Sequence, residues 1–330
     1  MRNADLAIDL GTAGARIAAR GRGVVATEPS VVAIRIGPRG REVEAIGKAA
    51  EEMLGRAPAD IEVGRPVRGG VVADFESTEH LVRHMVRAAG SRSLMRPRIV
   101  LPIPGVVSEV ERRAILDSTR SAGAREAAVV PAPLAAALGA GLPIDEPTGR
   151  CVIDIGAGVT QIAVVSLGGI VVQECVRIGG EDLDEATALW LRSRRGIIIS
   201  IAQARPVREQ AGTGKSPVTV RGRDVQTGKP RETSFTIGDL LEAVTDPLVR
   251  IRDAVLSVLA ATPPELAADI HDSGIVMCGG CAKSRPIGHM LRKATRLALA
   301  RAADPETTVI RGAALLLENP DLLERISTGK

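Results

Sequence analysis

The chain has 330 residues, of which 45% are hydrophobic and 25% charged, and its formal net charge is +4. This length and hydrophobic content predict a soluble protein of two domains, each of roughly 150 residues. The basic residues are spread along the chain, and Trp190, Phe75 and Phe235 are its only aromatic residues. We therefore expect neither a dedicated nucleic-acid surface nor base stacking on aromatic side chains.

No run of about 18 apolar residues is present, so the sequence predicts no transmembrane helix. A strand is predicted to begin near Asp5, and we expect no signal peptide and a cytoplasmic protein. Four Cys are too few for a disulfide framework. Cys278 and Cys281 form a C-x-x-C pair, but no second Cys or His pair stands at ligand spacing. A glycine turn with incidental thiols is therefore favoured over a zinc or redox site.

The first predicted hairpin runs from Leu6 to Asp9, turns through residues 11–14 and leaves as a strand from Arg16. A carboxylate beside a glycine turn suits a phosphate and a hydrated cation, although the same residues also serve turn geometry alone. The pattern returns 145 residues later, around Asp154. The repeat predicts two similar halves, whose loops face each other across a cleft and hold a polyphosphate and one Mg²⁺.

Along the first half, residues 30–75 are predicted to form a small peripheral subdomain. A helix is predicted over 78–89, where His80 and His84 stand four residues apart. Solvated histidines are favoured over a metal site, because no acidic or Cys partner completes a ligand set. Leu94 and Met95 lie among arginines, which is typical both of a loop that dips into an anionic membrane surface and of an ordinary basic loop.

Farther along the chain, caps and prolines delimit the predicted elements. Ser108 and Glu111 form a capping box for a helix that ends at Gly123. Pro206 fits only near the first turn of a helix, so we expect it to interrupt a helix over 204–210. The other predicted elements are strands at 98–101, 127–130, 151–165 (a hairpin), 171–176, 218–220, 233–237 and 274–277, and helices at 131–138, 183–194 and 238–261, the last divided by Pro247.

Six stretches between Asp9 and Gly180 carry a family resemblance. They are Asp9-Leu10-Gly11-Thr12-Ala13, Glu28-Pro29-Ser30-Val31-Val32-Ala33, and the segments 70–75, 110–115, 136–143 and 177–180. Together they resemble the MreB/Mbl family of bacterial actin-like, rod shape-determining proteins. The resemblance implies an α/β actin-like ATPase fold with two duplicated RNase H-like domains around a nucleotide cleft. The domains are expected at 1–145 and 146–330, with inserted subdomains at 30–75 and 181–245.

The resemblance also implies ligands, site residues and partners. The expected cofactors are ATP and Mg²⁺, the latter held through water by Asp9 and Asp154. The implied partners are further copies of the chain in a filament, a more typical paralogue, the wall-synthesis machinery and the inner face of the cytoplasmic membrane, reached by Leu94 and Met95. The implied nucleotide-binding residues are Gly11, Thr12, Ala13, Gly14, Gly156, Ala157, Gly158, Val159, Thr160, Arg205, Arg208, Gly279, Gly280, Cys281, Ala282 and Lys283.

Several cleft residues depart from the family's pattern. Its Glu-Glu-Pro, whose carboxylate orients the hydrolytic water, reads Pro131-Ala132-Pro133 here. A hydroxyl has become Val159, and Cys281 adds a side chain beside the adenosine position. Loss of a water-positioning acid costs roughly 10²–10⁴-fold in rate. We therefore expect a membrane-associated filament protein for cell shape and guidance of wall synthesis, which binds ATP and is at most a weak ATPase.

Two other interpretations are open at this point. The first is a nucleotide-free actin-like scaffold that co-assembles with a typical paralogue, which the residues Arg205, Pro206 and Cys281 favour. The second is a kinase-type or chaperone-type ATPase of the same superfamily. It is less favoured, because no further catalytic Asp stands out and the chain ends soon after residues 312–313.

Overall fold

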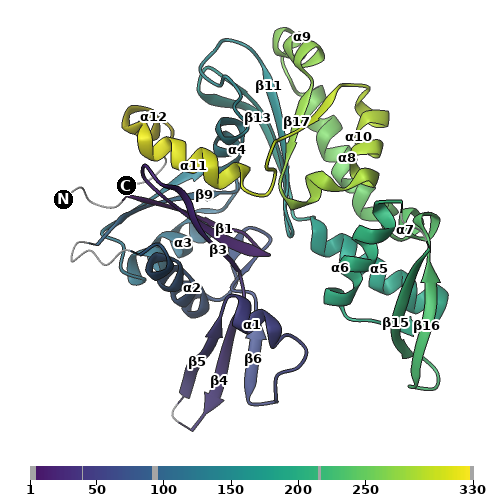
Figure 1. Ribbon diagram of the computed structural model, residues 1–330. Helices are drawn as coiled ribbons and strands as arrows, with labels where there is room; N and C mark the ends of the chain where they lie inside the picture. The colour runs from purple at the N-terminus through teal and green to yellow at the C-terminus, as the bar shows by residue number, and fades with distance from the viewer. Residues whose placement is uncertain (1–4, 39, 91–95, 215–216, 328–330) are drawn as a thin grey trace.

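The computed structural model describes residues 5–38, 40–90, 96–214 and 217–327. Two five-stranded sheets form its centre (Figure 1). The first has the order β10-β9-β1-β2-β3 and consists of β1 (Leu6–Leu10), β2 (Gly14–Ala19), β3 (Gly23–Pro29), β9 (Arg98–Ile103) and β10 (Glu126–Pro131). The second has the order β13-β12-β11-β17-β18 and consists of β11 (Arg150–Ile155), β12 (Thr160–Ser166), β13 (Gly169–Val176), β17 (Ile275–Cys278) and β18 (Leu299–Arg301).

The two sheets have the same topology. In each, three consecutive strands pair antiparallel, and two later strands join the edge of the first strand in parallel. Parallel neighbours need crossover connections, which here contain helices. The duplicated, mixed α/β fold expected from the repeated hairpin is therefore confirmed.

Two helices join the sheets to each other. α4 (Ala132–Gly139) and α11 (Thr308–Glu318) pack so closely that a β-carbon on Gly139 would meet the carbonyl oxygen of Thr308, and one on Gly312 that of Ala135. Helix α11 also contacts β1, β2 and β9. One apolar core therefore includes residues of both sheets, and the C-terminal part of the chain packs against the first sheet.

Alternate residues of each central strand enter different cores. Ala7 of β1 belongs to the core around α4 and α11, whereas Leu6 and Ile8 pack with α2 (Phe75–Ala88) and α3 (Glu109–Ser121). On β11, Val152 faces the shared core and Ile153 packs toward α8 (Thr245–Ala260) and α10 (Arg285–Thr295). This period of two is the ordinary geometry of a strand covered on both faces.

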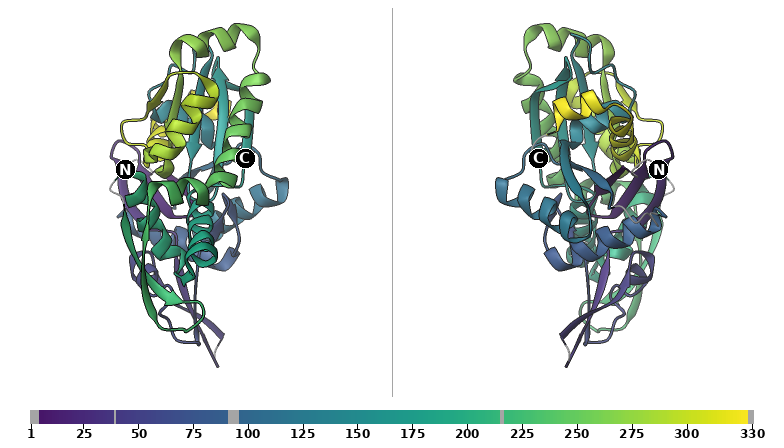
Figure 2. Two further views of the ribbon diagram at one scale, coloured as in Figure 1. Left: turned by 90° about the vertical axis from the view of Figure 1, so that its right-hand side faces the viewer. Right: turned by 90° about the vertical axis from the view of Figure 1, so that its left-hand side faces the viewer.

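Two smaller sheets extend from the same end of the molecule (Figures 1 and 2). One consists of β4 (Val32–Gly37), β5 (Gly40–Ile46) and β6 (Ile61–Gly64), next to α1 (Lys48–Glu52). The other consists of β14 (Ile197–Ile198), β15 (Val218–Asp224) and β16 (Pro230–Phe235), beside α5 (Gly180–Arg195), α6 (Ile201–Gly212) and α7 (Ile237–Ala243). The remaining elements are β7 (Val67–Arg68), β8 (Val71–Val72), α9 (Pro264–Ser273), a 3₁₀ turn (Gly280–Lys283) and α12 (Pro320–Ile326). The domain boundaries stay predictions.

Two prolines behave differently from the sequence-based prediction. Pro206 lies in the middle of α6, so the expectation that it stands only near a first turn was wrong. The capping box of Ser200 and Gln203 and the burial of Ala204 outweigh the lost backbone hydrogen bond. Pro247 does not divide the helical region either: the break falls at Val244, and Pro247 stands in the first turn of α8, where its missing N–H is not needed.

The predicted start of α3 is confirmed by its capping box. The Ser108 hydroxyl accepts a hydrogen bond from the Glu111 amide, and the Glu111 carboxylate accepts one from the Ser108 amide. Helices α9 and α12 were not predicted. Both begin at or next to a proline, and each is short.

Candidate functional site

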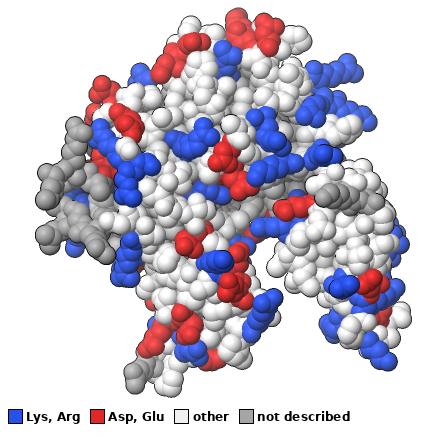
Figure 3. Space-filling model, viewed as in Figure 1, with Lys and Arg blue, Asp and Glu red and all other residues white. Residues whose placement is uncertain are grey.

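A cleft of about 650 Å³ lies between the two main sheets and their inserted lobes. Figure 3 shows the surface hollowed between the two lower lobes, with acidic and basic side chains interspersed on this face. Asp9, Asp154 and most of the predicted nucleotide-binding residues line the cleft. Those lining it are Gly11, Thr12, Ala13, Gly14, Gly156, Ala157, Gly158, Val159, Arg205, Arg208, Gly279, Gly280, Cys281 and Lys283.

Two predicted nucleotide-binding residues do not line the cleft. Thr160 is fully buried, and its hydroxyl donates to the carbonyl oxygen of Ile178. Ala282 is buried in the short 3₁₀ turn. At the altered acidic position, Ala132 faces the cleft but Pro131 does not.

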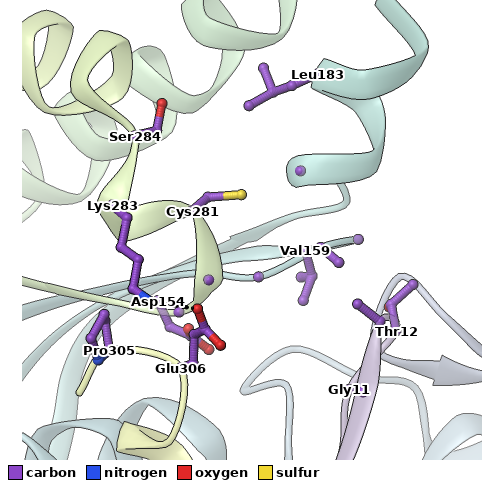
Figure 4. Close-up of a pocket in the computed structure, with 18 of the residues that line it drawn as sticks. Gly11, Thr12, Asp154, Val159, Leu183, Cys281, Lys283, Ser284, Pro305 and Glu306 are labelled. Atoms are coloured by element: carbon purple, nitrogen blue, oxygen red, sulfur yellow. Dashed lines mark hydrogen bonds and ion pairs between the residues drawn. The ribbon is translucent and has the colours of Figure 1, made fainter. Parts of the chain in front are cut away.

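The two hairpin loops are closed by the same backbone hydrogen bond. The Gly11 amide donates to the Gly14 carbonyl oxygen at 3.1 Å, and the Gly156 amide donates to the Val159 carbonyl oxygen at 2.9 Å. A β-carbon on Gly11 would stand 2.8 Å from that Gly14 oxygen, so this turn requires glycine. Figure 4 shows Gly11 and Thr12 opposite Val159, with one loop on each side of the cleft.

The tips of both loops carry free backbone donors. Within the described chain, the amides of Thr12, Ala13, Ala157 and Gly158 donate no hydrogen bond to another protein group. Adjacent backbone N–H groups that point into a concavity form an anion site. Four such groups, two from each loop, suit the oxygens of a phosphate chain.

Arg16 was not predicted as a site residue, yet it lines the cleft beside Asp9. The pairing of β1 with β2 places the two residues directly opposite each other, and Arg16 Nη1 lies 3.6 Å from Asp9 Oδ2. Burial raises the pKa of Asp9, and the charge of Arg16 opposes that shift. The sequence signal that could have identified Arg16 is the hairpin register: a turn through residues 11–14 pairs position 9 with position 16.

Asp154 occupies the matching place in the second sheet. Its pKa is raised to about 7, chiefly by burial and also by the negative charge of Asp9, while a hydrogen bond with the Cys278 thiol and the charge of Arg16 partly oppose the rise. The Cys278 pKa is raised well above its ordinary value by burial and by this acidic neighbour. Cys278 is fully buried and thus packs as a core residue.

The deeper wall of the cleft holds two arginines on one buried acid. Arg208 Nε lies 2.5 Å from Asp184 Oδ1, and Arg205 Nε lies 3.3 Å from Asp184 Oδ2. The Asp184 side chain is 1% exposed and that of Arg208 is 8% exposed. These contacts hold both guanidinium groups of α6 against α5, where they line the cleft, and Asp184 pairs with the charge of the buried Arg208.

Apolar side chains and a glycine turn complete the same wall. Figure 4 shows Cys281 and Leu183 on this side, with Lys283 extended toward Glu306. Lys283 Nζ lies 2.7 Å from Glu306 Oε1. Gly279 has φ +82° and would place a β-carbon against the Ile155 carbonyl and the Asp154 carboxylate. The further apolar lining residues are Leu240, Val244, Leu248, Pro286 and Ile287.

The part of the cleft next to β9 and β10 is apolar. Pro102, Pro104 and Ala132 line it, and no carboxylate from the described residues of 96–148 does so. The Gln161 side chain faces this region, but its Oε1 accepts a hydrogen bond from the Gly105 amide at 3.1 Å. No described acid is therefore placed here to orient an attacking water.

Direct contacts bridge the cleft. Arg65 donates to the carbonyl oxygens of Thr12 and Ala13, and its Nε lies 3.0 Å from Glu181 Oε1 on α5. Arg177 Nη2 lies 2.6 Å from Glu111 Oε1 on α3. The two halves are thus held together by two sets of polar contacts, one through Arg65 and one through Arg177.

Two further expectations concern membranes and metals. Leu94 and Met95 lie outside the described residues. In the described part of the chain, no helix combines the length and apolarity needed to cross a membrane, and no group of three or more His, Cys, Asp or Glu is placed to hold a metal ion. His80 and His84 are thus not part of such a group.

Comparisons with known proteins agree with this architecture. The model of the family described as MreB/Mbl protein matches residues 3–325. Cell shape-determining protein MreB of Escherichia coli K12 is 42% identical over 327 residues, covering 96% of this chain and 94% of that protein. Cell shape-determining protein Mbl of Bacillus subtilis 168 is 33% identical over 327 residues, covering 97% and 98%.

Solved structures show the same fold. The crystal structure of MreB5 of Spiroplasma citri bound to AMPPNP has a TM-score of 0.90 and 31% identity, covering 98% of this chain and 99% of that one. The MamK double helical filament has a TM-score of 0.82 at 23% identity, covering 96% and 99%, and supports the actin-like fold alone. By sequence and by structure, the chain belongs to the MreB/Mbl family.

Proposed function

We propose that this protein is an actin-like cytoskeletal protein of cell-shape determination, which assembles into filaments and binds an adenine nucleotide in its cleft with weak or absent hydrolysis. The observation that carries the nucleotide is the set of free amides at Thr12, Ala13, Ala157 and Gly158. The related MreB5 of Spiroplasma citri was solved with AMPPNP and with ADP. The names of the relatives support the role in cell shape.

We expect weak hydrolysis because the described residues that line the cleft next to β9 and β10 include no group that could activate a water molecule. A hydrolytic water needs a base or a positioning acceptor, and the residues facing that space are Pro102, Pro104 and Ala132. The Gln161 side chain could position a water molecule, but its oxygen already accepts a hydrogen bond from the Gly105 amide. We therefore expect bound ATP to persist.

Filament formation and membrane attachment extend this proposal. The partners are further copies of the chain, a typical paralogue and the wall-synthesis machinery, and the site of action is the cytoplasmic face of the membrane. Leu94 and Met95, next to Arg96 and Arg98, provide apolar and basic side chains for an anionic bilayer. The chain's mixed charge gives no support to nucleic acid as a partner.

A nucleotide-free scaffold is the second candidate, and the bridging contacts favour it. Arg65 with Glu181 and Arg177 with Glu111 hold the halves together with protein groups alone. In such a protein the cleft would be a structural remnant, and assembly would not respond to nucleotide. The kinase-type and chaperone-type alternatives gain no support from the described site.

Sedimentation and electron microscopy of the purified protein test the proposal. The protein is incubated without nucleotide, with ADP or with ATP, and in each case with and without anionic lipid vesicles. We expect filaments that form with ATP and bind the vesicles. Filaments that form equally well with and without nucleotide would favour the scaffold. A protein that stays monomeric under every condition would contradict assembly. The double variant Leu94→Ala/Met95→Ala is expected to form filaments that no longer sediment with vesicles.

A further inference from the structure

A row of three cleft residues crosses the first sheet. Strand pairing places Asp9 of β1 opposite Arg16 of β2, and Arg16 opposite Thr27 of β3. All three line the cleft. The side chains of Arg16 and Asp9 are 19% and 18% exposed, so the pair is mostly shielded but open toward a ligand. The guanidinium of Arg16 therefore lies beside Asp9, one of the two carboxylates that were expected to hold a cation.

The second sheet lacks this charge. There Asp154 of β11 is opposite Gln161 of β12, in the same register relation as Asp9 and Arg16. Gln161 is neutral, and its Oε1 accepts a hydrogen bond from Gly105. Arg16 is therefore a feature of one half of the repeat, and turn or sheet geometry does not require it.

Arg16 keeps N–H donors for an anion besides its ion pair with Asp9. Among the described residues, Asp9 is the carboxylate within ion-pair distance of Arg16. A guanidinium has five N–H donors in a planar fork, and such a fork matches the oxygens of a phosphate. The free amides of Thr12 and Ala13 lie on the loop between Asp9 and Arg16. Both kinds of donor thus converge on one end of the cleft.

A divalent cation does not fit the same place. An Mg²⁺ ion on Asp9 would have to share the carboxylate with a fixed positive charge, and like charges in a poorly solvated site repel. The expectation of Mg²⁺ held by Asp9 and Asp154 is thus at odds with the arrangement at Arg16.

We infer that Arg16 takes the place of the divalent cation, and that this cleft binds the polyphosphate of a nucleotide without Mg²⁺. The inference rests on the proposed nucleotide-binding function and adds a property of that site. Asp9 holds the guanidinium in position from one side. The positive charge that offsets the phosphate chain is then supplied by the protein itself.

Calorimetric titration with ATP tests this in two buffers, one with Mg²⁺ and one with EDTA. For the unaltered protein we expect dissociation constants that agree within about threefold. Arg16→Gln copies the residue of the second repeat, and we expect its affinity to fall at least about tenfold in EDTA and to recover with Mg²⁺. Arg16→Lys keeps a positive charge and is expected to bind in EDTA. Arg20→Gln, on an exposed arginine that pairs with Asp5 just beyond the same strand, is the matched control and should leave both constants unchanged.

The outcomes separate this inference from the function on which it rests. ATP binding by the unaltered protein that requires Mg²⁺ overturns the role of Arg16 but leaves nucleotide binding intact. Absence of binding in both buffers overturns the proposed nucleotide function and this inference with it. The comparison within the unaltered protein decides the matter even if Arg16→Gln fails to fold, which circular dichroism would reveal.

Discussion

Gly158 lies so close to Thr12 that a β-carbon on the glycine would stand 2.7 Å from the threonine hydroxyl oxygen. The same β-carbon would be 3.0 Å from the backbone nitrogen of Gly69. The loop of the second hairpin therefore touches both the loop of the first hairpin and the β7–β8 turn. The width of the cleft at this point depends on the absence of a side chain.

Gly158→Ala is predicted to weaken ATP binding by at least about tenfold and to cost about 1–3 kcal/mol of stability. The added methyl group meets the Thr12 side chain and the Gly69 backbone nitrogen, and so pushes the first loop and the β7–β8 turn away from the second loop. Calorimetry and denaturant unfolding provide the two measurements. Gly37→Ala is the control, because its β-carbon meets no atom within 4 Å. Equal behaviour of the two variants would show that the loop contact does not matter.

Ala132→Glu is predicted to increase ATP hydrolysis by about 10- to 100-fold, because it places an acid beside the phosphate loops. Ala132 lines the cleft and is the first residue of α4, where a negative charge also suits the helix N-terminus. Phosphate release under multiple turnover measures the effect. Ala132→Gln has nearly the same shape without the charge and should stay slow. An equal increase in both variants would rule out a carboxylate effect.

Asp184→Asn is predicted to destabilise the protein by about 3–5 kcal/mol, because it removes the buried carboxylate that pairs with Arg208 and leaves only the exposed Glu209, 3.7 Å away, as the ion-pair partner of that arginine among the described residues. The loss would be read from the midpoint of chemical unfolding. Glu185→Gln, one residue along on the exposed face of α5, should change stability by less than about 0.5 kcal/mol. If the Asp184 variant unfolded like the control, the buried ion pair would not contribute as described.

The raised pKa of Asp154 predicts a specific dependence of stability on pH. Its folded value of about 7 lies above the ordinary value of 3.8, so the folded protein keeps a proton that the unfolded chain has released. Stability is therefore lost as pH rises between these values. A shift of three pKa units corresponds to about 4 kcal/mol, and the open side of the cleft reduces this to about 1–3 kcal/mol.

Asp154→Asn cannot ionise and is predicted to lose this part of the pH dependence. The variant should be more stable than the unaltered protein at pH 8, by that same amount, and similar to it near pH 4. Unfolding curves at pH 4, 5, 6, 7 and 8 provide the comparison. Two parallel stability profiles would contradict the raised pKa.

The sequence predicted the elements whose signals are local. The hairpins at Asp9 and Asp154 follow from strand alternation around a glycine turn, and their repetition indicated the duplicated sheets. The capping box at Ser108 likewise needs only residues three apart. Most of the predicted nucleotide-binding residues line one cleft, and many of them belong to the two hairpins. Whether they bind nucleotide stays a prediction.

Features that depend on long-range packing were not predictable in this way. Asp184 looks like an ordinary helix residue until α6 brings Arg205 and Arg208 against it. Pro206 is tolerated inside α6 because the helix is capped and packed. Arg16 is intermediate: the hairpin register pairs it with Asp9, but its importance depends on the cleft that the second half provides.

The most direct test of the central claim is to identify the nucleotide that stays bound over time. The purified protein is loaded with ATP, freed of excess nucleotide and analysed by chromatography after several hours. We predict that one nucleotide per chain is retained and that it is still ATP. Recovery of ADP would contradict the absence of efficient hydrolysis, and recovery of no nucleotide would contradict binding in the cleft.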